Sequence, residues 1–522
     1  MKSANGPRPR RGRRWLRGLL FRLAAVIIGL APFVAAEAVL TLFDAGRPTY
    51  RDDPFVGFRA LHPLFVLSPD GARYEIAPSR QAHFRPESFA RRKAPGEFRV
   101  FCLGGSTVQG RPFAIETSFT TWLELSLQAA EPDRRWEVVN CGGISYASYR
   151  LVPVLEEVLR YQPDLVILCT GHNEFLEDRT YAHVKHLPEI VARPCEWVLQ
   201  TRTYTILREG YVRLRGRSAE RAPPDRPTLP SEVDAMLDYR GGLDQYHRDE
   251  RWRRDVIEHF GYNLRRMVEL ARRADVPLIL MNPVANLRDC PPFKSQHRDG
   301  LTPEQLQRWD RLVARAAEYE KTNMYQAAVT LEEALRIDDR HAAAHYLLAQ
   351  CYDALGEMDK AHRSYLQAKE LDVCPLRILE PMNQAILDVA RQTHTPLVDV
   401  RRLFEALTDS GIPGGYRLLD HVHPSIPGHQ LIANALADEM ARLGFVHPVP
   451  DWKPQRDRRF QEHFDSLDDF YFSKGEERLD RVQRWTQGQA TRTRRSRGRG
   501  PSADRPRRDQ GSPSNRQGPT EE

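Results

Sequence analysis

The sequence predicts an α/β protein built on a doubly wound parallel sheet, with helices on both faces and a smaller helical insertion. Short apolar runs bounded by turn residues recur along the chain, and this pattern is typical of strands that are buried on both faces. Longer segments with helical periodicity lie between these runs. Strands that alternate with helices form parallel sheets whose two faces are covered by the helices.

Five apolar runs are the expected strands of this sheet, namely residues 99–103, 138–139, 164–169, 276–281 and 396–400. The expected helices between them are residues 119–130, 150–161, 252–274 and 381–391. The last begins with Pro381, which a helix tolerates in its first turn. Ligands of such sheets bind at the carboxyl ends of the strands, so we expect the functional side chains at that edge.

Polar side chains follow three of these strands at the point where each strand ends. Ser106 comes after two glycines that end the first strand, Asn140 follows the second strand and Asn173 follows the third. Because the carboxyl ends of parallel strands meet at one edge of a sheet, we expect these three residues to lie close together. The alternative for each residue alone is a plain turn.

A fourth segment supplies the base and the orienting carboxylate that a serine nucleophile needs. Asp420 and His423 lie three residues apart in a loop before a helix that is expected to start near Ile426. A serine hydroxyl attacks well only when a base takes its proton and a third group orients that base. The structural alternatives are a surface loop histidine at position 423 and a helix-capping aspartate at position 420.

These segments, in this order, resemble the SGNH (GDSL-like) hydrolases. The match lies in Gly-Gly-Ser-Thr at 104–107, Gly-His-Asn at 171–173 and Asp-His-Val-His at 420–423. The resemblance implies a flavodoxin-like sheet with Ser106 as the nucleophile. It also implies that His423 is the general base and that Asp420 orients its imidazole.

The resemblance further implies an oxyanion hole formed by the N–H of Ser106, a second backbone N–H and the side-chain amide of Asn173. The family glycine that supplies the second N–H sits five residues after the asparagine of its block, and here that position is Ser145. A backbone donor needs glycine only for its conformation, so Ser145 can serve. A shifted register assigns the role to Gly143 instead, and both alternatives stay open.

The function expected from this resemblance is a serine esterase that removes O-acyl groups, O-acetyl foremost, from a polysaccharide or a lipid. The same residues would serve an O-acyltransferase of a cell-envelope glycan, because both reactions pass through one acyl-enzyme and the exclusion of water decides the outcome. A third alternative is a catalytically inactive scaffold, and the serine at position 145 is its only support.

Three further residues are candidate substrate ligands, for an anionic or sugar substrate. Asn286 and Arg288 lie in a loop that follows a strand at the same edge, and Arg111 lies just after the nucleophile block. A solvated loop explains each of them equally well. No cofactor is expected, and no metal, because the histidines lack a ligand spacing such as H-E-x-x-H.

An internal repeat lies between the fourth and fifth strands. The pattern of Ala327, Leu331 and Ala334 recurs 34 residues later in the chain. Small residues at this spacing match the tetratricopeptide repeat, in which they lie where two helices cross. We therefore expect a tetratricopeptide-like insertion in the hydrolase fold that offers a surface to a protein partner. Two ordinary amphipathic helical hairpins are the alternative.

The net charge of +7 belongs to the ends of the chain. The first 22 residues carry eight Lys and Arg and no acid, and residues 484–522 carry ten Arg against four acids. The residues between these ends therefore carry a net charge of about −7. The high pI consequently gives no reason to expect that the body of the protein binds nucleic acid.

The N-terminus has the pattern of a targeting segment. Residues 23–43 are apolar apart from Glu37, and 21 residues suffice to cross about 30 Å of hydrocarbon. Basic residues before such a segment favour the cytoplasmic side. We expect an uncleaved single-pass anchor with the catalytic body outside the cytoplasm, in the periplasm or cell envelope. A cleaved signal peptide is the rival, and a buried helix is the third alternative.

The seven cysteines do not suggest a disulfide framework, because their number is odd and several lie in predicted strands. Residues 50–97 are expected to form a short hairpin. The expected divisions are a basic cytoplasmic segment (1–22), a membrane anchor (23–43), a lead-in segment (50–97), the first part of the hydrolase domain (98–300), the repeat insertion (301–373), the last part of the hydrolase domain (374–447), a C-terminal extension (448–486) and a disordered basic tail (487–522).

Overall fold

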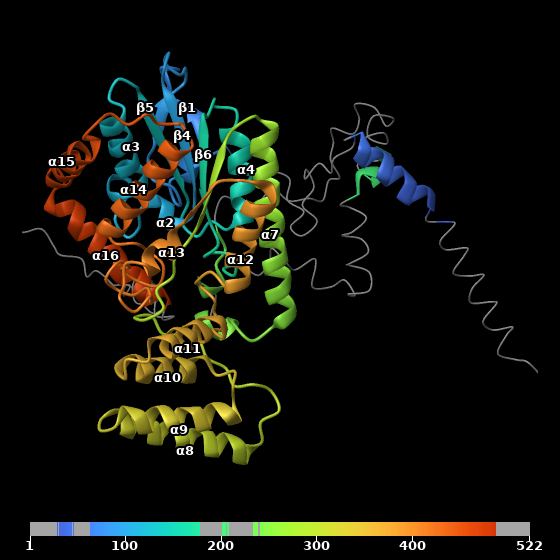
Figure 1. Cartoon of the computed structure of the whole chain (residues 1–522), viewed down its shortest axis with the longest axis vertical. Helices are drawn as coiled ribbons and strands as arrows, with labels where there is room; N and C mark the ends of the chain where they lie inside the picture. Colours follow the sequence, from blue (N-terminus) through green and yellow to red (C-terminus); the bar gives the residue numbers. More distant parts are fainter. Residues whose placement is uncertain are drawn as a thin grey trace, which may run out of the picture.

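The computed structural model of this 522-residue chain is shown in Figure 1. The predicted basic segment 1–22 and basic tail 487–522 lie outside the residues that the structure describes. The described residues are 29, 31–43, 45, 63–177, 201–204, 206–207, 233–238 and 241–486.

The centre of the fold is a five-stranded parallel sheet with the strand order β5-β4-β6-β7-β8. Its strands are β4 (Phe98–Gly104), β5 (Trp136–Gly142), β6 (Leu165–Cys169), β7 (Leu278–Asn282) and β8 (Leu397–Asp399). The first strand of this sheet in the sequence is β4. The next strand, β5, pairs with one edge of β4, and β6, β7 and β8 follow in turn on its other side. This is the predicted flavodoxin-like order, and its switch point lies beside β4, the strand that leads to Ser106.

Each strand contributes side chains to two separate cores, because successive residues point to opposite faces of a sheet. From β4, Phe101 and Leu103 enter one core, whereas Val100 and Cys102 enter the other. Every residue of β4 is buried, which explains its continuous apolar sequence. The cysteines that the structure describes are free thiols.

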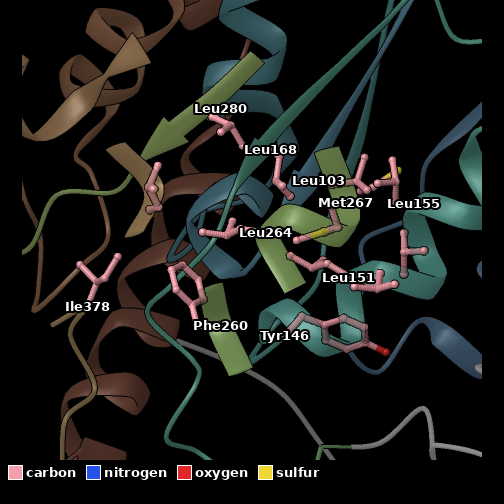
Figure 2. Close-up of a cluster of buried hydrophobic side chains, with 14 of the residues drawn as sticks. Leu103, Tyr146, Leu151, Leu155, Leu168, Phe260, Leu264, Met267, Leu280 and Ile378 are labelled. Carbon is pink, nitrogen blue, oxygen red and sulfur yellow. The ribbon is translucent and has the colours of Figure 1, made fainter. Parts of the chain in front are cut away.

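Helices cover both faces of the sheet, as expected of a doubly wound fold (Figure 1). In Figure 2, Leu103 and Leu168 of the sheet lie with Leu264 and Met267 of α7 in the first core. The helices of this face are α4 (Ser148–Val158), α7 (Glu250–Arg273) and α12 (Glu380–Thr393). Those of the other face are α3 (Phe119–Ala130), α13 (Val400–Glu405), α14 (Ile426–Arg442) and α15 (Trp452–Asp465).

Local sequence signals determine where several of these helices begin. The side chain of Ser118 accepts the N–H of Thr120 before α3, and that of Asp249 accepts the N–H of Trp252 before α7. Such caps satisfy backbone donors that lack a partner in the first turn of a helix. Helix α14 begins at Ile426 as predicted, with Ser425 as its cap.

The lead-in segment forms a three-stranded antiparallel sheet rather than the predicted hairpin. The third strand packs on the parallel sheet, since the ring of Phe89 contacts Phe101 at 5.2 Å between centroids. This contact with the parallel sheet stabilises the third strand, and a pattern confined to the hairpin residues cannot reveal it. The strands are β1 (Phe65–Leu67), β2 (Arg73–Ile76) and β3 (Ser88–Ala90), in that order.

Four helices between β7 and α12 form the predicted repeat insertion, and Figure 1 shows them stacked at one end of the molecule. They are α8 (Pro303–Glu320), α9 (Met324–Ile337), α10 (Ala342–Ala354) and α11 (Met358–Glu370). The repeated small residues Ala327 and Ala361 are completely buried in the core of this segment. Their size lets the helices approach closely, which is the physical basis of the 34-residue pattern.

The insertion is joined to the sheet-containing body by charged and polar contacts. The guanidinium of Arg253 on α7 lies 2.7 Å from the carboxylate of Glu370 at the end of α11. The buried carboxylate of Asp372 accepts the N–H groups of Phe293 and Lys294 at 2.8 and 3.0 Å. These contacts orient the insertion relative to the loop that follows β7.

The expected membrane anchor is described only in part, at residue 29 and residues 31–43. Among the described residues, no helix combines the length and apolar character that a membrane crossing needs. The carboxylate of Glu37 accepts hydrogen bonds from the backbone N–H groups of Arg202 and Thr203.

Candidate active site

The nucleophile candidate Ser106 is the first residue of the short helix α2 (Ser106–Gln109), immediately after β4. Gly105 forms the turn between strand and helix. A Cβ atom on Gly105 would lie 2.6 Å from Nδ2 of Asn173, too close for either atom to stay in place. Glycine at this position therefore lets the Asn173 amide approach the turn that presents the serine.

The structure brings Ser106, His423 and Asp420 together in one chain of hydrogen bonds. Oγ of Ser106 lies 2.7 Å from Nε2 of His423, and Nδ1 of His423 lies 2.6 Å from Oδ2 of Asp420. When Nδ1 donates its proton to the carboxylate, Nε2 is free to accept the proton of the serine hydroxyl. This arrangement can activate a serine for attack on a carbonyl carbon.

The backbone of its own loop holds Asp420 in this orientation. Oδ1 of Asp420 accepts the N–H groups of Val422 and His423, both at 2.9 Å. Burial favours the neutral acid, but the imidazoles of His423 and His421 and these hydrogen bonds outweigh it and hold the pKa of Asp420 below its usual range. Asp420 is therefore ionised at neutral pH and remains an acceptor for the imidazole.

The hydrogen bonds of the loop after β5 distinguish the two candidates for the second oxyanion donor. The N–H of Gly143 donates to the carbonyl of Gly104 at 2.9 Å, so it is engaged within the sheet. The N–H of Ser145 has no acceptor among the described residues, and Ser145 lines the same cavity as Ser106. Ser145 is therefore better placed than Gly143 to serve as the second donor.

The backbone conformation explains why glycine is the usual residue at this position. Ser145 has a φ of 62°, in the left-handed region that costs other residues about 1–2 kcal/mol. Serine adopts the required conformation here at that cost. The departure from the family pattern therefore changes the strain of the loop and leaves its N–H donor in place.

Asn140 supports the site from behind. Its side-chain amide donates to the carbonyl of Val108 at 2.7 Å, and its side-chain oxygen accepts the N–H of Gly142 at 2.9 Å. Val108 belongs to α2, the helix that begins with Ser106. Asn140 thus fastens α2 to the end of β5.

A cavity of about 820 Å³ opens at the carboxyl ends of the strands. Of the residues predicted from sequence, it is lined by Ser106, His423, Ser145, Asn173 and Arg111. The amide Nδ2 of Asn173 donates to the carbonyl of Tyr146 at 3.1 Å, which keeps its donor group at the cavity wall. The candidate residues that follow different strands therefore line one and the same cavity.

Asn286 and Arg288, the other two candidate substrate ligands, do not line this cavity, and both side chains are engaged elsewhere. Asn286 is buried, and its amide donates to the backbone carbonyl of Asp420 at 3.1 Å. Arg288 forms a two-point ion pair with Asp353 of the repeat insertion. Asn286 thus holds the loop of Asp420, and Arg288 connects the loop after β7 to α10.

Sequence reasoning missed the last helix that the structure describes, α16 (Asp469–Thr486), which borders the cavity. Arg481, Val482 and Trp485 of α16 line the cavity together with Ser106. The hydroxyl of Tyr471 lies 2.8 Å from that of Thr117, and this contact helps dock the helix. The only sequence signal is an amphipathic pattern, and nothing in it points to a site some 370 residues earlier.

Three buried histidines near the site are held neutral by their surroundings. Burial lowers the pKa of His421 to about 4 and that of His429 to about 3, and it also lowers the pKa of His172. The ring nitrogen Nδ1 of His172 accepts the N–H of Ile378 at 3.1 Å. Within the described residues, no group of three His, Cys, Asp or Glu side chains could hold a metal ion.

A buried carboxyl beside the site makes stability depend on pH. Burial raises the pKa of Glu174 to about 7, against an ordinary value of 4.5. Between these values the folded chain holds a proton that the unfolded chain has lost, so the free energy of unfolding falls as pH rises from 4.5 through 7. Glu87, whose pKa burial also raises to about 7, contributes with the same sign.

We expect urea unfolding at pH 5 and pH 8 to show this loss, and we expect Glu174→Gln to reduce it. Glutamine keeps an acceptor for the N–H of Ser148, which Glu174 binds at 2.7 Å. The variant retains part of the pH dependence through Glu87. An identical loss of stability in the variant and the unmodified protein would contradict the assignment to Glu174.

Two family models match the chain. Residues 102–347 match the GDSL-like lipase/acylhydrolase family, and residues 323–372 match a tetratricopeptide repeat, which confirms the predicted repeat. The first match includes Ser106 and Asn173 and ends before Asp420 and His423. No curated protein matches the chain in a sequence comparison.

Several solved structures are similar to the chain. An acetylxylan esterase from Geobacillus stearothermophilus has a TM-score of 0.30 and 15% identity, and the match covers 66% of this chain and 94% of that one. A lipase/acylhydrolase from Enterococcus faecalis has a TM-score of 0.30 and 11% identity, with 67% and 98% covered. An α/β hydrolase from the metagenome of Lake Arreo, Spain, has a TM-score of 0.29 and 15% identity, with 66% and 95% covered.

Proposed function

We propose that this chain, which carries a domain of the GDSL-like lipase/acylhydrolase family, is an exported, membrane-anchored serine esterase. The family match confirms the predicted class, an enzyme that acts on ester bonds. The proposal adds that the esterase removes O-acyl groups, O-acetyl foremost, from a polysaccharide or a lipid. Its main support is the hydrogen-bonded chain from Ser106 through His423 to Asp420.

The proposed reaction begins when Oγ of Ser106 attacks the acyl carbonyl and Nε2 of His423 takes its proton. The negative charge on the carbonyl oxygen is stabilised by the N–H groups of Ser106 and Ser145 and by the Asn173 amide. Collapse of the intermediate breaks the ester bond, and His423 returns the proton to the leaving alcohol. Water then attacks the acyl-enzyme by the same route and releases the acid.

Asn173 is expected to act mainly in the transition state. Asn173→Asp keeps the size of the side chain and removes its donor, so we expect kcat to fall by about 10²–10³-fold with little change in KM. Steady-state hydrolysis of p-nitrophenyl acetate measures both constants. An unchanged kcat would exclude Asn173 from the oxyanion hole, provided that the variant unfolds at the same temperature as the unmodified protein.

One experiment tests the proposed activity directly. A fluorophosphonate probe is expected to label the full-length chain at Ser106, and the labelled protein is expected to lose hydrolysis of p-nitrophenyl acetate. An unlabelled, inactive chain would instead support the scaffold alternative. Transfer of the acetyl group to an added glycan alcohol, with no hydrolysis, would identify an acyltransferase.

The export part of the proposal rests on the apolar segment 23–43 and on the basic residues before it. Bacterial alkaline phosphatase fused to the C-terminus is expected to be active, because its disulfides form only outside the cytoplasm. Deletion of residues 1–43 is the control and should abolish that activity. An inactive fusion of the full chain would reject export.

A further inference from the structure

The cavity wall carries one arginine, Arg111, whose guanidinium has no acidic partner among the described residues. Arg111 lines the cavity, and its backbone N–H donates to the carbonyl of Ser106 at 3.1 Å, which ties it to the nucleophile. Its Nε is buried without a partner, and its guanidinium makes no hydrogen bond or ion pair with any residue that the structure describes. Arginine is rarely buried in this way unless an anion completes the site.

Other arginines increase the positive charge beside Arg111. Arg85 likewise has a buried Nε without a partner in the described part of the chain. The charges of Arg478 and Arg481 of α16 also act on Arg111, and Arg481 lines the cavity. Burial and the charges of these three arginines lower the pKa of Arg111 to about 10.

The acids of the same cavity wall are already engaged. The carboxylate of Glu477 binds Arg481 and Lys474, at 2.7 and 2.9 Å. Asp238 accepts the indole N–H of Trp485 at 2.9 Å. The charge of Asp420 acts on Arg111 as well, but its carboxylate is hydrogen-bonded to His423. Among the described residues, none of these acids pairs with the guanidinium of Arg111, which is therefore available to an anionic ligand.

We infer that the cavity binds a substrate that carries an anionic group close to the scissile ester, with Arg111 as the main ligand of that anion. A carboxylate of an acidic sugar and a phosphate of a lipid or glycan offer the same chemistry, since both accept two parallel N–H groups of a guanidinium. This inference rests on the proposed esterase and narrows its substrate class. Arg85 and the arginines of α16 contribute through charge.

The test compares kcat/KM of the full-length protein on two matched pairs of esters. The pairs are monoacetylated glucuronic acid with monoacetylated glucose, and acetylglycerol phosphate with acetylglycerol. We expect the anionic member of at least one pair to be preferred by about 10- to 100-fold. The pair that shows the preference identifies the source of the anion as carboxylate or phosphate.

Arg111→Gln is expected to bring the preference close to unity, whereas Arg111→Lys should retain part of it, because lysine keeps the charge without the paired donors. The control is Arg336→Gln, since Arg336 is largely exposed on α9 of the insertion. Equal use of the anionic and neutral esters by the unmodified protein would overturn the inference. Retention of the preference in Arg111→Gln would overturn it as well.

A binding measurement separates this inference from the proposed function. Full-length Ser106→Ala is titrated with glucuronate and with glycerol phosphate by calorimetry, and Arg111→Gln in the same background should lose the binding. Binding of an anion at Arg111, together with no ester hydrolysis by the unmodified chain, would support the anion site and overturn the esterase. Hydrolysis of neutral esters without anion binding would support the esterase and overturn the inference.

Discussion

Replacement of Ser106 by alanine is expected to lower kcat for ester hydrolysis by about 10⁴-fold or more, because the variant has no atom that can form the acyl-enzyme. His423 then lacks the hydroxyl from which Nε2 takes a proton at 2.7 Å. The remaining oxyanion donors can still bind substrate, so KM should change far less than kcat. Steady-state hydrolysis of p-nitrophenyl acetate measures both constants.

Two controls make this result specific. Ser466→Ala removes an exposed hydroxyl at the end of α15 and should leave kcat unchanged. Thermal unfolding of Ser106→Ala should remain close to that of the unmodified protein, since only one oxygen is removed. A kcat within tenfold of the unmodified value would show that Ser106 is not the nucleophile.

Asp420→Asn is expected to lower kcat by about 10⁴-fold for a different reason. The backbone N–H groups of Val422 and His423 require an acceptor at the position of Oδ1, so the asparagine oxygen should occupy it. The NH₂ group then faces Nδ1 of His423 and donates to it. The imidazole must therefore carry its proton on Nε2, where it cannot accept the proton of Ser106.

The same variant is informative about stability. Asp420 has a pKa below its usual range in the folded chain, so its carboxylate contributes stability that is present above its unfolded pKa and is lost as pH falls. Asp420→Asn should therefore be less stable than the unmodified protein at pH 7, and the difference should shrink in acid. Asp438→Asn, a change at an exposed position, is the control. Full activity of Asp420→Asn would reject its role in orienting His423.

The sheet and the convergence of the site could be predicted because both depend on local patterns. Buried strands are visible as apolar runs, and the residue after each run lies at the strand end. These patterns alone place Ser106 and Asn173 at one edge of the sheet, and both residues line the cavity there. The order of the five strands followed from the resemblance, and the structure has that order.

Other features of the site depend on contacts that no local pattern encodes. The choice between Ser145 and Gly143 required the φ angle of one residue and the hydrogen bond of the other. Arg288 and Arg111 look alike in the sequence, but an aspartate of the insertion binds one, and the other has no partner among the described residues. The docking of α16 depends on long-range contacts such as that of Tyr471 with Thr117.

The position of the repeat insertion has a consequence for the order in which the protein is made. Ser106 and His423 are 317 residues apart, and the four helices of the insertion are synthesised between them. At roughly 5–20 residues per second, the ribosome needs on the order of tens of seconds to pass from one to the other. During that interval the nascent chain contains the proposed nucleophile without the proposed base. Strand β8 can pair with β7 only after the insertion has been synthesised, and until then the proposed site is incomplete.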